Sequence, residues 1–142
     1  LVFSKGNRSA AVRIPVAAVT PKGCRIEFRT PDSTANPYLA FSAMLMAGLD
    51  GIKKKINPVE LGYGPADKNL YDLPDEEKSQ IRSVPGSLEE ALDSLEADSA
   101  FLTEGGVFSE DFIANYIAFK RAEAKQVSIR VHPHEYSLYY DC

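Results

Sequence analysis

The sequence contains no tryptophan, two histidines and only two cysteines among its 142 residues. Cys24 and Cys142 lie far apart and form no cluster with the histidines, so neither a disulfide scaffold nor a four-ligand zinc site is expected. Cys24 belongs to an alternating polar and apolar segment, and we expect it to be a small core residue on the apolar side. A cytoplasmic location is the simplest expectation for so little cysteine.

Long hydrophobic runs are also missing. The longest, residues 38–49, is interrupted by Ser42 and Gly48 and is shorter than the roughly 20 residues that cross a bilayer. Residues 1–8 lack the basic stretch and following apolar stretch of a signal peptide, and there is no initiator methionine. We therefore predict no membrane segment and interpret the sequence as a piece of a longer chain.

Positive charge is in deficit, because 16 Lys and Arg stand against 20 Asp and Glu, for a formal net charge of -4. This balance disfavours nucleic acid and anionic membranes as partners, so a bound anion would have to be held by local arginines. The length and the 44% share of hydrophobic residues fit one globular domain.

The pattern of residues predicts an α+β chain. Residues 11–16 and 24–29 alternate polar and apolar positions around turn-forming residues 20–23, which predicts two antiparallel strands. Asn36 and Pro37 are typical of a helix start, and the helix predicted from there to about Ile56 is apolar on almost every side, so we expect it to be buried. A long ordered loop is expected over 57–85. Two strands alone form a marginal sheet, so further strands are expected upstream.

Two amphipathic helices are predicted in the second half. One begins with the capping box from Ser87 to Glu90, and the other begins after Ser109. The aromatic end, residues 132–140, is ambiguous. His132 and His134 could bind a metal, but no third ligand accompanies them, and we favour a structural role.

The strand 24–29 carries the first candidate site. Arg25, Glu27 and Arg29 alternate along it and would project from one face, about 7 Å apart at twice the strand rise. Glu27 could ligate Mg²⁺ or Mn²⁺ through oxygen, and each arginine could bind a carboxylate or phosphate. The alternative is a solvated strand face with cross-strand ion pairs, which is the commoner meaning of an isolated Arg-x-Glu-x-Arg motif.

Arg8, Arg13 and Lys22 add positive charge close by in an otherwise acidic chain. Phosphoryl transfer needs such groups to neutralise charge on the transferred phosphate. The sequence has no glycine-rich phosphate loop, so a P-loop or a Rossmann site is not predicted.

Several motifs in order along the chain strongly resemble the C-terminal part of the catalytic domain of bacterial type I glutamine synthetase. They lie at residues 7–15 (Asn-Arg-Ser-Ala-Ala-Val-Arg-Ile-Pro), 25–32 (Arg-Ile-Glu-Phe-Arg-Thr-Pro-Asp), 35–41, 46–52, 69–74 (Asn-Leu-Tyr-Asp-Leu-Pro), 86–92, 105–108 and 138–140. The resemblance covers essentially the whole chain, so residues 1–142 are interpreted as a partial catalytic domain.

The resemblance implies ATP-dependent ligation of ammonia to L-glutamate through γ-glutamyl phosphate. The arginine that matches Arg8 acts in catalysis and contacts glutamate and the ATP phosphates, and Arg29 matches a glutamate-binding arginine. The remaining matches are Arg13, Lys22 and Arg25 at ATP-binding positions, Glu27 as a ligand of Mg²⁺ or Mn²⁺, and Tyr71 as the tyrosine that some bacterial enzymes adenylylate. Tyr71 could instead simply pack its loop.

The resemblance also implies that the N-terminal domain and most metal-binding carboxylates lie upstream of Leu1, so this chain alone is expected to be inactive. The family forms a dodecamer of two hexameric rings, with each active site between neighbouring subunits. Two alternatives remain: another carboxylate-amine ligase of the same superfamily, or an assembly module without catalysis.

Overall fold

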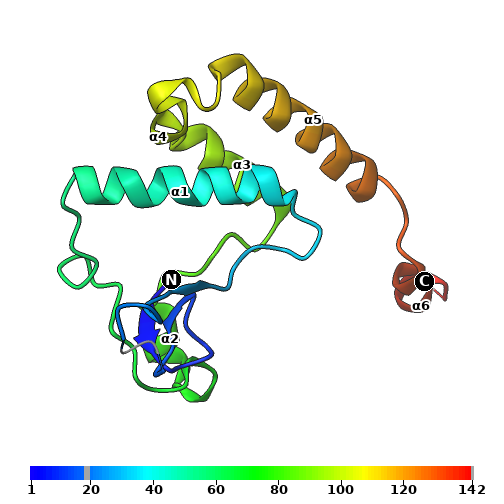
Figure 1. Ribbon diagram of the computed structural model, residues 1–142. Helices are drawn as coiled ribbons and strands as arrows, with labels where there is room; N and C mark the ends of the chain where they lie inside the picture. Colours follow the sequence, from blue (N-terminus) through cyan, green and yellow to red (C-terminus); the bar gives the residue numbers. More distant parts are fainter. Residues whose placement is uncertain (18–19, 142) are drawn as a thin grey trace. The chain divides into compact units, whose positions relative to one another are not determined.

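A computed structural model describes residues 1–17 and 20–141 of the chain (Figure 1). The chain divides into two compact units, Leu1–Val84 and Pro85–Cys142. Strands are confined to the first unit, within the described residues, and helices occur in both. The predicted α+β class is therefore confirmed.

The first unit contains a small sheet of β1 (Phe3–Lys5), β2 (Val12–Ile14) and β3 (Glu27–Phe28), in that order. The predicted antiparallel pair is confirmed as β2 with β3, although both strands are shorter than predicted. The strand β1, which was not predicted, pairs with β2 in parallel. The prediction for Cys24 was wrong, because Cys24 lies outside β3 and is exposed to solvent.

The connection from β1 to β2 doubles back on itself. Two parallel neighbours must start at the same end, so residues 6–11 return along the sheet before β2 begins. Gly6 makes the first turn with φ +78°, and a Cβ there would lie 2.9 Å from the side chain of Val16. An L-residue at this position would be strained as well as crowded. This return segment contains Arg8.

The outer edge of β1 is covered by residues 63–66. Phe3 N–H donates to Tyr63 O at 2.8 Å, and Ala66 N–H donates to Phe3 O at 3.0 Å. Ser4, in the middle of β1, is completely buried. The loop predicted over 57–85 is thus anchored by backbone hydrogen bonds, and it contains two short helices that were not predicted, η1 (Leu70–Asp72) and α2 (Asp75–Ser79).

The helix α1 (Pro37–Lys53) begins where the sequence predicted, since the Asn36 side chain accepts a hydrogen bond from Tyr38 N–H at 3.0 Å. The prediction that this helix is buried was wrong: none of its residues is buried, and Tyr38, Phe41 and Ile52 are largely exposed. An apolar pattern on all sides calls for cover on all sides. Within the first unit, α1 does not have this cover.

The second unit is helical, with α3 (Leu88–Ala97), α4 (Ala100–Thr103), η2 (Glu104–Gly106), α5 (Glu110–Ser128) and α6 (Pro133–Tyr139). Both predicted caps are confirmed: Ser87 Oγ accepts from Glu90 N–H and Ser109 Oγ accepts from Phe112 N–H, each at 3.1 Å. The Glu90 carboxylate accepts from Gly86 N–H at 2.7 Å. The helices α3 and α5 pack together over a core of Leu92, Leu102, Ile113, Ile117 and Ala124.

The ambiguous aromatic end forms α6, and its histidine has a structural role. His132 Nδ1 accepts from His134 N–H at 3.1 Å, and Glu135 accepts from His132 N–H at 2.8 Å. These two bonds form a capping box. Among the described residues, no helix is both long enough and apolar enough to span a bilayer.

Candidate functional site

The antiparallel pairing of β2 and β3 places Arg13 directly opposite Glu27. Arg13 Nη1 lies 2.6 Å from Glu27 Oε2, and Arg13 Nε donates to Gly6 O at 3.2 Å. Both side chains are partly shielded, with 19% of Arg13 and 33% of Glu27 exposed. The cross-strand ion pair considered as the alternative for this motif is therefore present.

Three arginines act on the Glu27 carboxylate. The hydrogen bond from Arg13 lowers the pKa of Glu27, partial burial opposes this shift, and the charges of Arg13, Arg25 and Arg29 lower the pKa further. Arg29 Nη1 lies 3.9 Å from Glu27 Oε2. Glu27 is consequently ionised at neutral pH and offers oxygen lone pairs on a surface rich in positive charge.

Glu27 alone fits only part of a metal site. Its ionised carboxylate is the hard oxygen donor that Mg²⁺ and Mn²⁺ prefer, but one oxygen already accepts from Arg13. Residues 1–17 and 20–141 contain no group of three or more His, Cys, Asp or Glu side chains placed to hold a metal. A divalent ion bound at Glu27 would need further oxygen ligands from elsewhere.

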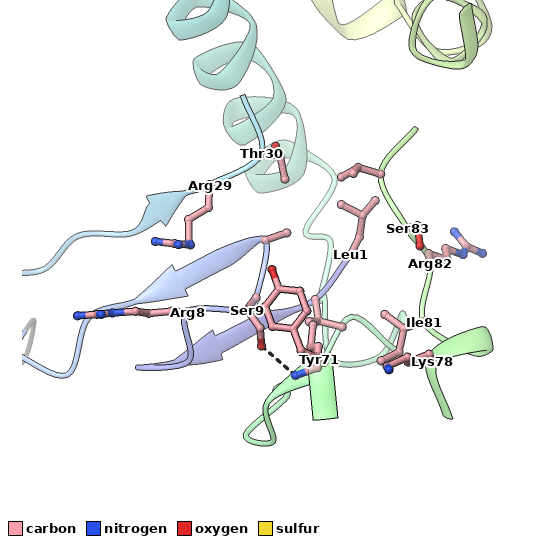
Figure 2. Close-up of a pocket in the computed structure, with 15 residues that line it drawn as sticks. Leu1, Arg8, Ser9, Arg29, Thr30, Tyr71, Lys78, Ile81, Arg82 and Ser83 are labelled. Atoms are coloured by element: carbon pink, nitrogen blue, oxygen red, sulfur yellow. Dashed lines mark hydrogen bonds between the residues drawn. The ribbon is translucent and has the colours of Figure 1, made fainter. Parts of the chain in front are cut away.

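A cavity of about 600 Å³ in the first unit brings Arg8, Arg29 and Tyr71 together. Figure 2 shows the side chains of Arg8 and Arg29 extending to the same side of it. Lys78 and Arg82 also line the cavity. The sequence did not predict either residue, because Lys78 lies within α2 and Arg82 follows it, and no helix was expected there. With four cationic side chains in its wall, the cavity can accept anionic ligands.

The side chains of Lys78 and Arg82 each contact another residue of the first unit. Arg82 Nη1 donates to the Tyr63 hydroxyl at 2.9 Å, and its guanidinium carbon lies 5.8 Å from the centre of the Tyr63 ring. Lys78 Nζ lies 3.9 Å from Asp75. Arg8, in contrast, forms no hydrogen bond or ion pair with any residue that the structure describes. Its charge is available to a ligand.

Tyr71 lies in η1, where its backbone N–H donates to the Asn69 side chain at 3.3 Å. The residue is 77% exposed, so its phenol is accessible to solvent even though it lines the cavity. Lys22 is exposed in the turn after residue 20 and lines neither this cavity nor the Arg13–Glu27 pair. The structure thus gathers the predicted residues into two groups and leaves Lys22 outside both.

The residues on either side of Arg8 connect it to the segment that carries Tyr71. Asn7 Nδ2 donates to Ala66 O at 3.0 Å and to Lys68 O at 2.7 Å. Ser9 Oγ accepts from Leu70 N–H at 3.0 Å, the bond drawn in Figure 2. These contacts were not predicted, because they join residues about 60 positions apart and no local pattern indicates such pairs.

Comparisons with known proteins agree with the sequence motifs. The family model described as "Glutamine synthetase, catalytic domain" matches residues 1–139. The chain is 59% identical to the glutamine synthetase of Microchaete diplosiphon, covering 100% of this chain and 30% of that protein. It is 58% identical to the glutamine synthetase of Mycobacterium tuberculosis strain CDC 1551, covering 99% and 29%.

A solved structure, the "GmaS/ADP complex", matches with a TM-score of 0.77 and 31% identity over 99% of this chain and 29% of that one. The chain therefore spans about 30% of the length of the curated relatives it matches.

Proposed function

Because the chain belongs to the glutamine synthetase catalytic-domain family, we propose that a full-length enzyme containing it makes L-glutamine from L-glutamate, ammonia and ATP. A glutamate side-chain oxygen attacks the γ-phosphorus of ATP, and the bond to ADP breaks. Ammonia then attacks the acyl carbon of γ-glutamyl phosphate, inorganic phosphate leaves, and ammonia loses a proton. The observation that carries this proposal is the cationic cavity that contains Arg8 and Arg29.

The arginines bind two different anions, the glutamate carboxylate and the phosphates of ATP. Arg29 holds a glutamate carboxylate, and Arg8 faces both glutamate and the transferred phosphoryl group, where it offsets charge as the new bond forms. Arg13, Lys22 and Arg25 bind ATP on the nucleotide side. Arg8 and Arg29 line one cavity, which supports a shared position next to the reacting atoms.

Glu27 contributes one ligand to Mg²⁺ or Mn²⁺, and the ion neutralises phosphate charge when it is bound. The hydrogen bond from Arg13 lowers the pKa of Glu27 and so favours the carboxylate form that a divalent ion binds. The other ligands belong to parts of the full-length enzyme outside residues 1–142, and the chain by itself is inactive for that reason.

We further infer that the full-length protein is a cytoplasmic homo-oligomer, a dodecamer of two hexameric rings, in which residues 1–142 form part of the catalytic domain. Tyr71 is a site of adenylylation, and its exposed phenol supports this role. A nucleotide attached there would place a phosphodiester anion at the rim of the arginine-lined cavity.

The function is tested by measuring glutamine formation and ADP release by the full-length enzyme and its Arg29→Ala variant. Loss of charge-assisted hydrogen bonds worth about 1.5–3 kcal/mol predicts a roughly 10- to 150-fold lower kcat/KM for glutamate. The KM for ATP should change less. Arg130→Ala, which removes an exposed arginine of the second unit, is the matched control.

Two results would contradict the proposal in different ways. Glutamate-dependent ADP release that needs an amine other than ammonia would point to a different carboxylate-amine ligase, and absence of both products would support the assembly-module alternative. An Arg29→Ala variant that matches Arg130→Ala would leave the reaction intact and remove Arg29 from the glutamate site.

A further inference from the structure

We propose that Asn7 and Ser9 are positioning residues that fix Arg8 in the cavity by fastening its turn to the segment 66–71. The proposal rests on the proposed function, because it concerns how Arg8 is presented to its anionic ligands. It adds two residues whose proposed role is to act through their neighbour.

The hydrogen bonds form a connected set around Asn7. Its Oδ1 accepts from Ser9 N–H at 2.9 Å and from Ser9 Oγ at 2.7 Å, while its Nδ2 donates to Ala66 O and Lys68 O. Both amide hydrogens and the carbonyl oxygen are thus used. Ser9 Oγ donates to Asn7 and accepts from Leu70 N–H, so one hydroxyl closes the set. We call these five hydrogen bonds the Asn7–Ser9 clamp.

The clamp determines where Arg8 lies, because the Arg8 side chain has no other interaction with the described residues that would fix its position. Its side chain makes no hydrogen bond or ion pair with the described residues, and its backbone belongs to the segment that returns between two parallel strands. Asn7 and Ser9 flank it on both sides. A cation held only by its backbone is preorganised to the extent that the backbone is fixed.

The clamp also ties Arg8 to a second segment that lines the cavity. Leu70 and Tyr71 line the same cavity as Arg8 and Ser9, and Leu70 supplies the N–H that Ser9 binds (Figure 2). A movement of the segment 70–71 would therefore strain or break the hydrogen bond to Ser9 and loosen the backbone on either side of Arg8. The position of Tyr71 and the position of Arg8 are linked through one backbone N–H and one hydroxyl.

The test uses the full-length protein and two measurements. The first is amide hydrogen exchange of peptides covering residues 66–72 in Ser9→Ala, Ser9→Thr and Asn7→Asp. Loss of a hydrogen bond worth about 0.5–1.5 kcal/mol predicts roughly 2- to 12-fold faster exchange at Leu70 in Ser9→Ala. Ser9→Thr keeps the hydroxyl and should restore the wild-type rate. Asn7→Asp loses the two donated bonds and should speed exchange at residues 66–68.

The second measurement is the steady-state kinetics of glutamine formation. Ser9→Ala should lower kcat at least fivefold and alter the KM for ATP less, while Ser9→Thr should recover most of kcat. A clamp that only stabilised the fold would lower the melting temperature without this selective effect and rescue. Asn57→Ala is the control, because Asn57 also binds a backbone N–H and a side chain in the first unit but lies outside the cavity.

Each outcome has a distinct meaning. Exchange that is unchanged in Ser9→Ala and Asn7→Asp overturns the clamp itself. Faster exchange with kinetics equal to Asn57→Ala overturns its role in positioning Arg8. A wild-type enzyme that forms no glutamine overturns the proposed function and the role of Arg8 that depends on it, and the exchange data still report on the clamp.

Discussion

Truncation of Leu92 tests whether α3 and α5 are held together by the core of the second unit. Leu92 is 3% exposed, and Leu92→Ala removes three carbon groups worth about 0.8 kcal/mol each, or about 2.4 kcal/mol. The cavity left by the truncation adds to this cost, so we expect the free energy of unfolding to fall by about 3 kcal/mol. Leu88, in the same helix, is 43% exposed, and Leu88→Ala should cost only about 1 kcal/mol because solvent already reaches it.

Helix propensity cancels in this comparison, since both variants replace leucine by alanine in α3. The assay is native-state hydrogen exchange at the amides of Ile113 and Ile117 in the opposite helix, in the 142-residue chain. A loss of 3 kcal/mol accelerates exchange through unfolding of the unit by roughly 150-fold, and a loss of 1 kcal/mol by about fivefold. Equal acceleration by the two variants would refute the view that Leu92 is the buried contact.

Two further predictions concern the first unit. The pKa values of Glu27 and Asp32 lie below their ordinary 4.5 and 3.8, through hydrogen bonds from Arg13 and Thr34 respectively. Their stabilisation is therefore present at neutral pH and is lost as the pH falls below these values, so the urea midpoint should drop between pH 5 and about 3, and less steeply in Thr34→Val. Adenylylation predicts that full-length protein from its own cells carries AMP on the Tyr71 peptide; Tyr71→Phe should lack it, and AMP mapped to another residue would contradict this.

The sequence predicted best what is decided locally. The caps at Asn36, Ser87 and Ser109 each depend on a side chain and an N–H two or three residues away, and all three are confirmed. The antiparallel β2–β3 pair is also confirmed, because it joins two alternating segments that are neighbours along the chain. The roles of the site residues toward substrates stay predictions, which the geometry of the cavity supports.

What the sequence could not predict depends on distant partners. The strand β1 has three residues and no periodicity to detect, and its outer edge is satisfied by residues about 60 positions away. The apolar pattern of α1 predicted burial, but burial depends on packing partners that a local pattern does not identify, and no residue of α1 is buried. The hydrogen bonds of the Asn7–Ser9 clamp could not be predicted, because asparagine and serine next to a glycine are also common in ordinary turns.

The hydrogen bonds between Phe3 and the segment 63–66 also have a consequence for the entropy of the chain. They close a loop of about 60 residues, which includes the whole of α1, at a length-dependent cost of roughly 3.6 kcal/mol from (3/2)RT ln n. Because the cost grows only logarithmically, a further 10 or so residues inserted in an exposed turn of this loop would add only about 0.1 kcal/mol. The number of residues in the loop that contains α1 therefore has little effect on the free energy of folding. The residues whose hydrogen bonds close the loop, Phe3 and the segment 63–66, are constrained much more strongly.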